Sequence, residues 1–454
     1  MHRVRWVAAA TALVCAARAP AEVLPASAVA ADLAYLRDVW AARERSLTPA
    51  ARARVASFID AHLERPRAME RHELALLFWE AQALTGNNHS QSSFLDVDGL
   101  FTSLPFSCWF FPEGAVVTRA HPDYRRLLGA RIVAIGGVST EEATRRVERF
   151  IAGTPQRKRY VAPALLARLE VLEAVGLARG RAADVDLVLP SGERVAERLG
   201  PAPSPDPAAR SAPWRASMVP GKGPAPWPHV LDSLPALPPY VRPPDEMSSL
   251  SLGEDVLYVR STSLASPGDE MSVQRKAYEV VDGAVKSGRR PRDLVVDLRY
   301  NGGGNLFNVL SLAVELPKLV GPRGRVYVVT GRATNSAAIV FAALLKAHAP
   351  ERTTIAGEEV SDDLWFWSEG GDLRAPASRL PLHYADGFHD WAHGCEDLSR
   401  CYWPVVFHGV AVGSLAPDLP VDLTFADYAA GRDPVLDRIL AEIANGRRGG
   451  ERAR

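Results

Sequence analysis

The sequence lacks an excess of charge of either sign. Its 53 lysine and arginine residues balance 53 aspartate and glutamate residues, so the formal net charge is zero. A protein that binds nucleic acid needs a basic face to neutralise phosphates, and this balance gives no sign of one. Lysine itself is rare, at positions 158, 222, 276, 286, 318 and 346. We attribute the preference for arginine, like the abundance of alanine, to genomic base composition.

Long apolar runs are also lacking. No segment after the first residues has about eighteen uncharged apolar residues, so we expect a soluble mature protein without a stable membrane span. The chain begins with a basic stretch, and a short apolar run follows over residues 6–17. With small residues at Ala19 and Ala21, this pattern predicts a secretory signal peptide over residues 1–21 and a periplasmic or secreted protein. A mature start at residues 30–31, or a buried first helix, is the alternative.

Cysteine is scarce, with four copies. If Cys15 leaves with the signal peptide, Cys108, Cys395 and Cys401 remain. An exported protein meets an oxidising compartment, which favours a small disulfide loop between Cys395 and Cys401. Cys108 would then be a lone thiol, buried among its aromatic neighbours.

The pattern of apolar residues divides the first half of the chain into three parts. Residues 30 to about 85 have apolar residues at three- and four-residue spacing, which predicts a helical N-terminal region over residues 30–104. Residues 105–200 predict a small α+β module, with strands at 116–117, 130–135 and 185–189 and a helix at 140–151. Fourteen prolines between Pro201 and Pro244 mark residues 201–245 as a Pro-rich linker.

The second half alternates apolar strands with amphipathic helices. We expect strands at 256–259, 294–298 and 326–329, and helices at 270–286, 306–316, 336–348 and 434–445. This alternation indicates an α/β layer structure over residues 246–445. An arginine-rich tail, residues 446–454, is expected to be disordered.

Familiar catalytic motifs are absent, since the chain has no GxSxG, HExxH, Walker or dinucleotide-binding pattern. Two segments nevertheless put backbone N–H groups at helix starts. Consecutive glycines at 302–304 follow a buried strand, where they could hold an oxyanion or phosphate or form a plain turn. Ser336 begins an apolar helix, so the N–H of Ala337 could face a developing oxyanion. On local grounds alone, a simple N-cap is the better explanation of Ser336.

A third polar segment lies far upstream, at the end of the helical region. His89 stands among small polar residues in the run Asn87–Gln91, which makes it a candidate general base because imidazole titrates near neutral pH. A surface histidine without function is the simpler interpretation of this segment alone.

Taken in order, these segments resemble the S41 serine peptidases, also called tail-specific or C-terminal processing proteases. The resemblance runs from about His89 to Leu440. It is carried by Leu294–Gly304, by Val326–Gly331 followed by Ser336–Ala338, by Thr354–Glu358, by Ala416–Val421, by Asp427–Leu436 and, upstream, by Arg126–Gly137.

The resemblance implies an α/β fold with a crotonase-like catalytic core, a PDZ-like module at 105–200 and a helical N-terminal region. It implies a peptidase that acts on polypeptides through Ser336 as the nucleophile. The N–H groups of Gly303 and Ala337 would form the oxyanion hole. No metal and no organic cofactor are implied.

The scarcity of lysine helps to choose the base. One branch of the family uses a lysine shortly after the nucleophile helix, but Lys346 lies ten residues after Ser336 on the same helix and no lysine follows. The tricorn-like branch uses an upstream histidine, and His89 matches its position. The resemblance therefore implies a histidine-assisted serine peptidase.

The acid that orients this histidine is less defined by the resemblance. Glu369 is the best candidate by position, and Glu358 is an alternative that suits a structural role at a strand end equally well. Tricorn-like relatives carry a glutamate where this chain has the run Gly409–Gly413, which contains no carboxylate. Ile339 also departs from the acid that relatives often have three residues after the serine.

Three other interpretations compete with this one. The departures near Ala411 and Ile339 allow a catalytically silent peptide-binding protein on the same fold. A crotonase-type acyl-CoA enzyme shares the expected core, although export argues against a cytoplasmic CoA substrate. Finally, nitrogen and sulfur ligands at short spacing could hold zinc, namely His383, His389, His393, Cys395 and Cys401.

Overall fold

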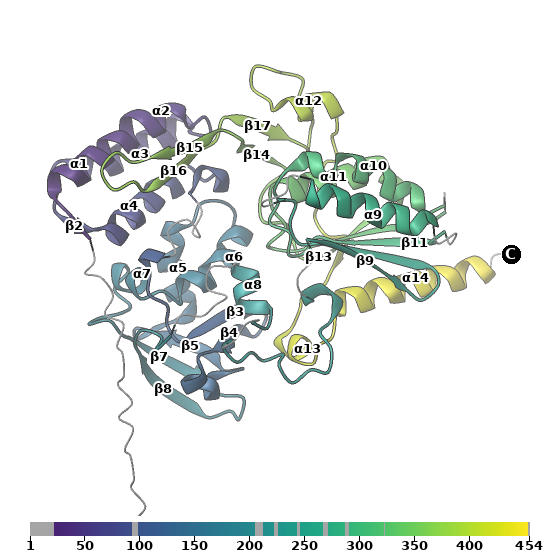
Figure 1. Cartoon of the computed structure of the whole chain (residues 1–454), viewed down its shortest axis with the longest axis horizontal. Coiled ribbons are helices and arrows are strands. Elements are labelled where there is room, and N and C mark those ends of the chain that lie inside the picture. Colours follow the sequence, from purple (N-terminus) through teal and green to yellow (C-terminus); the bar gives the residue numbers. More distant parts are fainter. Residues whose placement is uncertain are drawn as a thin grey trace, which may run out of the picture.

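The computed structural model describes residues 22–92, 99–204, 212–221, 226–242, 246–266, 271–286, 290–321 and 323–452. The predicted signal peptide and Cys15 lie outside these residues. The described chain forms an N-terminal body, residues 22–204, and a C-terminal body, residues 246–452 (Figure 1). None of the described helices has a segment long and apolar enough to cross a bilayer.

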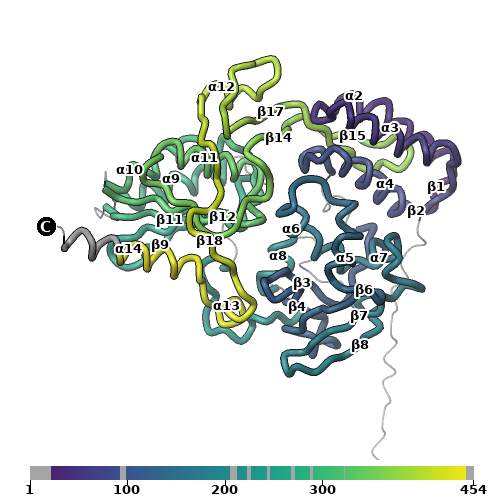
Figure 2. Tube along the Cα trace, turned by 180° about the vertical axis from the view of Figure 1, so that it is seen from behind, coloured from purple at the N-terminus to yellow at the C-terminus, as the bar shows by residue number. Residues whose placement is uncertain are grey.

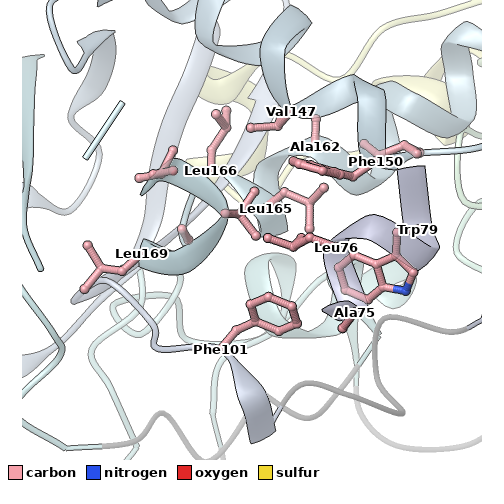
Figure 3. Close-up of a cluster of buried hydrophobic side chains, with 14 of the residues drawn as sticks. Ala75, Leu76, Trp79, Phe101, Val147, Phe150, Ala162, Leu165, Leu166 and Leu169 are labelled. Atoms are coloured by element: carbon pink, nitrogen blue, oxygen red, sulfur yellow. The ribbon is translucent and has the colours of Figure 1, made fainter. Parts of the chain in front are cut away.

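The N-terminal body begins with helices, as predicted. They are α1 (Ala26–Tyr35), a π-helical turn (Leu36–Trp40), α2 (Ala41–Arg43), α3 (Pro49–Leu63) and α4 (Arg71–Ala83), with β1 (Val23–Leu24) paired to β2 (Met69–Glu70). Their apolar faces share one core with the strands and helices that follow. Figure 3 shows part of this core, where Leu76 and Trp79 of α4 meet Phe150 and Leu165. The burial of these large side chains joins the helical region to the module.

The module is an antiparallel sheet with helices packed against it. Its strands are β3 (Phe106–Phe111), β4 (Gly114–Ala120), β5 (Arg131–Ile135), β7 (Ala183–Val188) and β8 (Arg194–Leu199), in that spatial order, with β6 (Val138–Ser139) beside β5. Its helices are α5 (Thr140–Val147), α6 (Pro155–Leu165) and α7 (Leu169–Ala174). The three strands and the first helix expected from the sequence lie at the predicted positions, whereas α6 and α7 were not predicted.

The segment predicted as a Pro-rich linker is packed in its described part. It contains α8 (Pro213–Met218), and the Trp214 ring stacks on Tyr300 of the C-terminal body, with ring centroids 4.9 Å apart. Met218 and Leu231 are buried in the same cluster. Because isolated aromatic and apolar side chains do the packing here, the segment has no periodicity that a sequence pattern could reveal.

The C-terminal body is built on a six-stranded sheet in the order β18-β13-β12-β11-β10-β9. The strands are β9 (Met247–Leu252), β10 (Val256–Ser261), β11 (Asp293–Asp297), β12 (Val326–Thr330), β13 (Thr353–Gly357) and β18 (Leu419–Pro420). All neighbours are parallel except β9 and β10. The central strands are buried on both faces, as the run of valines in β12 requires.

Helices cover both faces of this sheet (Figure 1). Those on one face are α9 (Ser272–Lys286), α10 (Leu310–Leu319) and α11 (Ala337–His348), while α14 (Pro434–Arg452) packs on the other face through Val435 and Ile439. The smaller helices are α12 (Trp403–His408) and α13 (Phe425–Ala429). The helix α14 extends to Arg452, into the segment that the sequence predicts to be a disordered tail.

A long arm, residues 365–390, leaves the C-terminal body and reaches the N-terminal helices (Figures 1 and 2). Its base is the strand pair β14 (Trp365–Ser368) and β17 (Gly387–Asp390), and its tip is the pair β15 (Gly371–Arg374) and β16 (Pro381–Tyr384). Leu380 and Leu382 of the tip belong to the apolar core of the N-terminal body. The arm therefore ties the two bodies together.

Candidate active site

Three neighbouring strands bring the candidate residues to one edge of the sheet. In the order β11, β12, β13, the parallel strands end at Asp297, Thr330 and Gly357. The loops that follow carry the glycine run, Ser336 and a pair of aspartates. Ligand and catalytic sites of α/β sheets are commonly built from such loops at the carboxyl ends of the strands.

Gly303 lies directly against Ser336. Its φ is +95°, and a Cβ atom at this position would lie 2.7 Å from Cβ of Ser336 and 2.8 Å from the carbonyl oxygen of Asn335. Only glycine fits both the space and the backbone angle. The Gly303 N–H donates to Oδ1 of Asn301 over 2.9 Å. The glycine run therefore brings a backbone N–H beside the serine. In this state that N–H donates to the side chain of Asn301 in the same loop.

Ser336 has a strained backbone at the start of α11. Its φ is 54° and its ψ is −129°, which is unusual for a residue with a side chain. The hydroxyl makes no capping hydrogen bond, so Ser336 does not fill the simple N-cap role that its local sequence allows. The adjacent N–H of Ala337 lies in the first turn of α11, where backbone donors have no acceptor in their own helix. The half-buried serine thus sits at the positive end of a helix.

His89 comes from the N-terminal body and reaches the same place. It lies on a 3₁₀ turn, Asn88–Ser90, that follows α4. Nδ2 of Asn88 donates to Oδ1 of Asn335 over 3.2 Å and also to the carboxylate of Asp362. Because Asn88 and Asn335 directly precede His89 and Ser336, this hydrogen bond holds the two candidate loops together. The His89 side chain is 14% exposed, so it is not a surface histidine.

Asp362 is the carboxylate beside His89. Its Oδ2 lies 3.8 Å from Nδ1 of His89, and its side chain is buried. Oδ1 of Asp362 accepts a hydrogen bond from the N–H of Asp363 over 3.0 Å. Among the described residues, neither ring nitrogen of His89 has a hydrogen-bond partner, so no bond to Ser336 or Asp362 is made in this state.

Burial shifts the pKa values of this pair in opposite directions. Loss of hydration lowers the pKa of His89 to about 3, and electrostatic coupling to His389, Arg157 and His383 acts in the same direction. Loss of hydration raises the pKa of Asp362 to about 7, helped by the charge of Asp363 and opposed by that residue's N–H and by Arg157. The imidazole is therefore neutral near neutral pH, as a general base must be.

The structure pairs Glu369, the predicted acid, with a different histidine. Its carboxylate lies 3.4 Å from Nε2 of His389 at the base of the arm, and its side chain is 40% exposed. Asp362 occupies the place beside His89 that Glu369 was expected to fill. The sequence did hold a signal for it, because Asp362 and Asp363 follow β13, the parallel neighbour of the strand that leads to Ser336.

Two further residues considered as base or acid have structural partners. Glu358 forms a partly buried ion pair with Arg332, whose Nε donates to it over 2.8 Å. The Arg332 guanidinium holds the pKa of Glu358 below its ordinary value, although burial acts in the opposite direction. Nζ of Lys346 donates to the carbonyl oxygen of Ser414 over 2.7 Å, at the end of α11 far from Ser336. Glu358 has the strand-end structural role.

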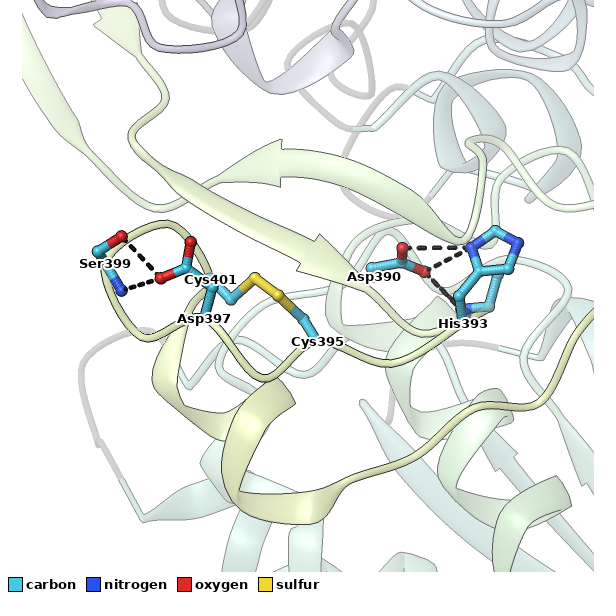
Figure 4. Close-up of a disulfide and its surroundings, with 7 residues drawn as sticks. Asp390, His393, Cys395, Asp397, Ser399 and Cys401 are labelled. Carbon is cyan, nitrogen blue, oxygen red and sulfur yellow. Dashed lines mark hydrogen bonds and ion pairs between the residues drawn. A yellow bond between two sulfur atoms is a disulfide. The ribbon is translucent and has the colours of Figure 1, made fainter.

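The residues of the zinc interpretation do not assemble. Cys395 and Cys401 form a disulfide, as predicted, so their sulfurs are bonded to each other (Figure 4). His393 faces Asp390 with Nδ1 3.2 Å from the carboxylate, and no group of three or more possible metal ligands exists among the described residues. Cys108 is a buried free thiol, as expected.

Comparisons with known proteins bear on the fold. No protein-family profile and no curated protein matches the sequence. A structure of mature CPAF complexed with lactacystin aligns at a TM-score of 0.58 and 11% identity, covering 92% of this chain and 97% of that chain. A crystal structure of a CPAF mutant aligns at a TM-score of 0.55 and 11% identity, covering 89% of this chain and 95% of that chain.

A putative S41 protease from Bacteroides fragilis is also similar, at a TM-score of 0.31 and 12% identity, over 76% of this chain and 83% of that chain. The chain has a mixed α/β fold like that of CPAF. At these identities the likeness concerns the fold, and the chemistry must be argued from the site itself.

Proposed function

We propose that the protein is an exported serine peptidase that hydrolyses peptide bonds through an acyl-enzyme on Ser336. The observation that supports it best is the meeting of three loops. Strained Ser336 begins α11 without capping it, Gly303 packs against its Cβ, and Asn88 ties the His89 loop to the serine loop. A strained residue at a helix start is typical of sites where a reactive side chain must be presented.

In this mechanism, His89 takes the proton of the Ser336 hydroxyl as Oγ attacks the carbonyl carbon of the substrate. The N–H groups of Ala337 and Gly303 stabilise the oxyanion, which displaces Oδ1 of Asn301 from the Gly303 N–H. His89 then gives the proton to the leaving amine, and water hydrolyses the acyl-enzyme. Asp362, 3.8 Å from the imidazole, stabilises the imidazolium that forms.

The remaining parts of the chain have roles in this proposal. The six-stranded sheet is the crotonase-like core, and residues 105–200 are a PDZ-like module that holds a polypeptide substrate. Residues 1–21 direct export to the periplasm or beyond. The chemistry needs neither a metal ion nor an organic cofactor, because a neutral imidazole and backbone N–H groups supply the proton transfer and charge stabilisation.

A fluorophosphonate probe tests the proposal, since it reacts covalently with an activated serine. We expect the wild type to be labelled, Ser336→Ala to be unlabelled and His89→Gln to be labelled about a hundred-fold more slowly or less. Ser361→Ala is the matched control, because this nearby serine is buried and its hydroxyl has no hydrogen-bond partner among the described residues. It should be labelled like the wild type.

The second candidate function is a catalytically silent peptide-binding protein on the same fold. The absence of a hydrogen bond to either nitrogen of His89, within the described chain, favours it. A folded wild type that the probe does not label would reject the peptidase and leave this function. Labelling that persists in Ser336→Ala would instead move the nucleophile to another residue.

A further inference from the structure

The plane of the His89 ring is held by stacking and not by hydrogen bonds. Its imidazole lies parallel to the ring of Phe366, with centroids 5.1 Å apart and an interplanar angle of 14°. Neither ring nitrogen has a hydrogen-bond partner in the described part of the chain. In serine hydrolases a hydrogen bond to a carboxylate usually orients the histidine, so stacking has to supply that orientation in this state.

A second histidine backs Phe366 from the other side. The ring of His389 stacks on Phe366 with centroids 4.6 Å apart and an interplanar angle of 12°. Phe366 on β14 and His389 on β17 are direct cross-strand partners, which are the pairs that meet most closely in an antiparallel ladder. Both side chains are buried. Phe366 is thus enclosed between two imidazoles.

His389 is itself fixed in place. Nε1 of Trp391 donates to its Nδ1 over 3.2 Å, so the neutral ring carries its proton on Nε2. That nitrogen faces the carboxylate of Glu369 at 3.4 Å. Glu369 therefore reaches the candidate base only through His389 and Phe366.

Resting on the proposed function, we propose that Phe366 and His389 are positioning residues that fix the ring plane of the general base His89. Parallel stacking opposes rotation of the imidazole about its Cβ–Cγ bond, which would tilt the ring, so its two nitrogens stay in the plane that must contain both Asp362 and the serine hydroxyl. The stack also keeps water from the face of the ring. The arm, which carries both residues, thereby takes part in the site.

Removal of one stacking ring tests this role. Phe366→Leu keeps an apolar side chain but loses the stack, and we expect the rate of fluorophosphonate acylation to fall about ten-fold, the scale of one aromatic pair. Trp367→Leu is the matched control. Trp367 is the next residue of β14, so its side chain points to the opposite face of the strand, where it packs on Phe388. This variant should keep the wild-type rate.

A second pair of variants tests whether the aromatic ring of His389 or its nitrogen atoms are needed. His389→Leu should lower the acylation rate in the same direction as Phe366→Leu. His389→Phe restores a ring on the far side of Phe366, and we expect it to recover most of the lost rate. If His389→Phe is as slow as His389→Leu, stacking is not what His389 provides.

A readout that does not depend on activity completes the test. NMR of histidine Cε1 signals, with His89→Gln for assignment, follows protonation of His89 in each variant. Phe366→Leu should raise the pH at which His89 titrates toward the ordinary histidine range, whereas Trp367→Leu should not. The groups that act on the charge of His89 are Asp362, Arg157, His383 and, except in the two His389 variants, His389.

The two readouts keep the two proposals apart. A wild type that is never acylated rejects the peptidase, while the NMR titrations still decide the stack. Unchanged acylation together with an unchanged His89 titration in Phe366→Leu would overturn the positioning role, provided that thermal unfolding shows the variant to be folded.

Discussion

At the scale of single residues, the carboxylate beside His89 decides how the proton relay is built. Asp362→Asn keeps the shape of the side chain but removes the charge 3.8 Å from Nδ1 of His89. An imidazolium that forms during catalysis would then lose its stabilising partner. We expect the acylation rate to fall by about a hundred-fold or more, measured with the fluorophosphonate probe above pH 7, where Asp362 is ionised.

Two neighbouring carboxylates serve as comparisons for Asp362→Asn. Asp363→Asn changes the adjacent, exposed aspartate and should label at nearly the wild-type rate. Glu369→Gln should have a smaller effect than Asp362→Asn, because Glu369 contacts His389 and not His89. The opposite order, with Glu369→Gln nearly inactive, would restore Glu369 as the acid of the relay.

The sequence predicted some of these residues and not others for a physical reason. Ser336 and Gly303 each stand in a contiguous strand–loop–helix pattern, and His89 stands in a short polar run, so local sequence and family resemblance point to them. The contact between Asp362 and His89 joins segments from two bodies, and only the fold reveals it. Glu369 was favoured by its position along the chain, which does not show which histidine it meets.

At the scale of elements, the sequence predicted helices and strands with a regular apolar pattern. It did not predict segments whose buried contacts are made with a distant part of the chain. Strands β10, β11 and β12 lie where apolar runs placed them, because helices cover both faces of the sheet and its strands are apolar throughout. The arm strands have four residues each, and at the tip the buried side chain of Leu382 packs on the N-terminal body. No local pattern encodes such packing, so the arm was missed.

Two buried carboxylates fasten the arm to the N-terminal helices. Asp32, fully buried on α1, accepts hydrogen bonds from the N–H groups of Ala377 and Ser378 over 2.7 and 2.8 Å. Glu44, also fully buried, accepts from the N–H of Ala385 over 3.0 Å. Such charge-assisted bonds are stronger than those between neutral groups.

We expect Asp32→Asn to destabilise the protein by about 1–3 kcal/mol, because an amide cannot accept from both N–H groups and one donor is left unsatisfied. Urea unfolding measures this loss. Asp38→Asn is the control: Asp38 is exposed and pairs with Arg37, so its removal should leave the unfolding midpoint nearly unchanged. Equal midpoints for both variants would show that Asp32 does not anchor the arm.

At the scale of the whole molecule, the candidate site is shared between two bodies. His89 belongs to the N-terminal body, while Ser336, Gly303 and Asp362 belong to the C-terminal body. The arm and the packed segment around Trp214 hold these bodies in contact. Assembly of the site is therefore a property of the folded whole, and the pair of His89 and Asp362 reports on it.

The two groups of this pair have opposite effects on stability as pH changes. His89 has a folded-state pKa of about 3, below its ordinary value, so the unfolded chain binds its proton more readily and stability increases as pH rises toward about 6.5. Asp362 has a folded-state pKa of about 7, above its ordinary value, so the folded chain keeps its proton and this contribution is lost as pH rises from about 4 through 7. Between about pH 4 and 6.5, His89 makes stability rise with pH and Asp362 makes it fall, so the two contributions oppose each other.

Single variants should reveal how each group makes stability depend on pH. In His89→Gln only the Asp362 contribution remains, so stability should fall relative to the wild type as pH rises from about 4.5 to about 6.5, and in Asp362→Asn it should rise. Urea midpoints at both pH values measure the change. The double variant should return to the wild-type slope, because both contributions are gone. Wild-type slopes in both single variants would mean that burial at the contact between the bodies does not shift these groups, and that the two bodies do not enclose the pair in solution.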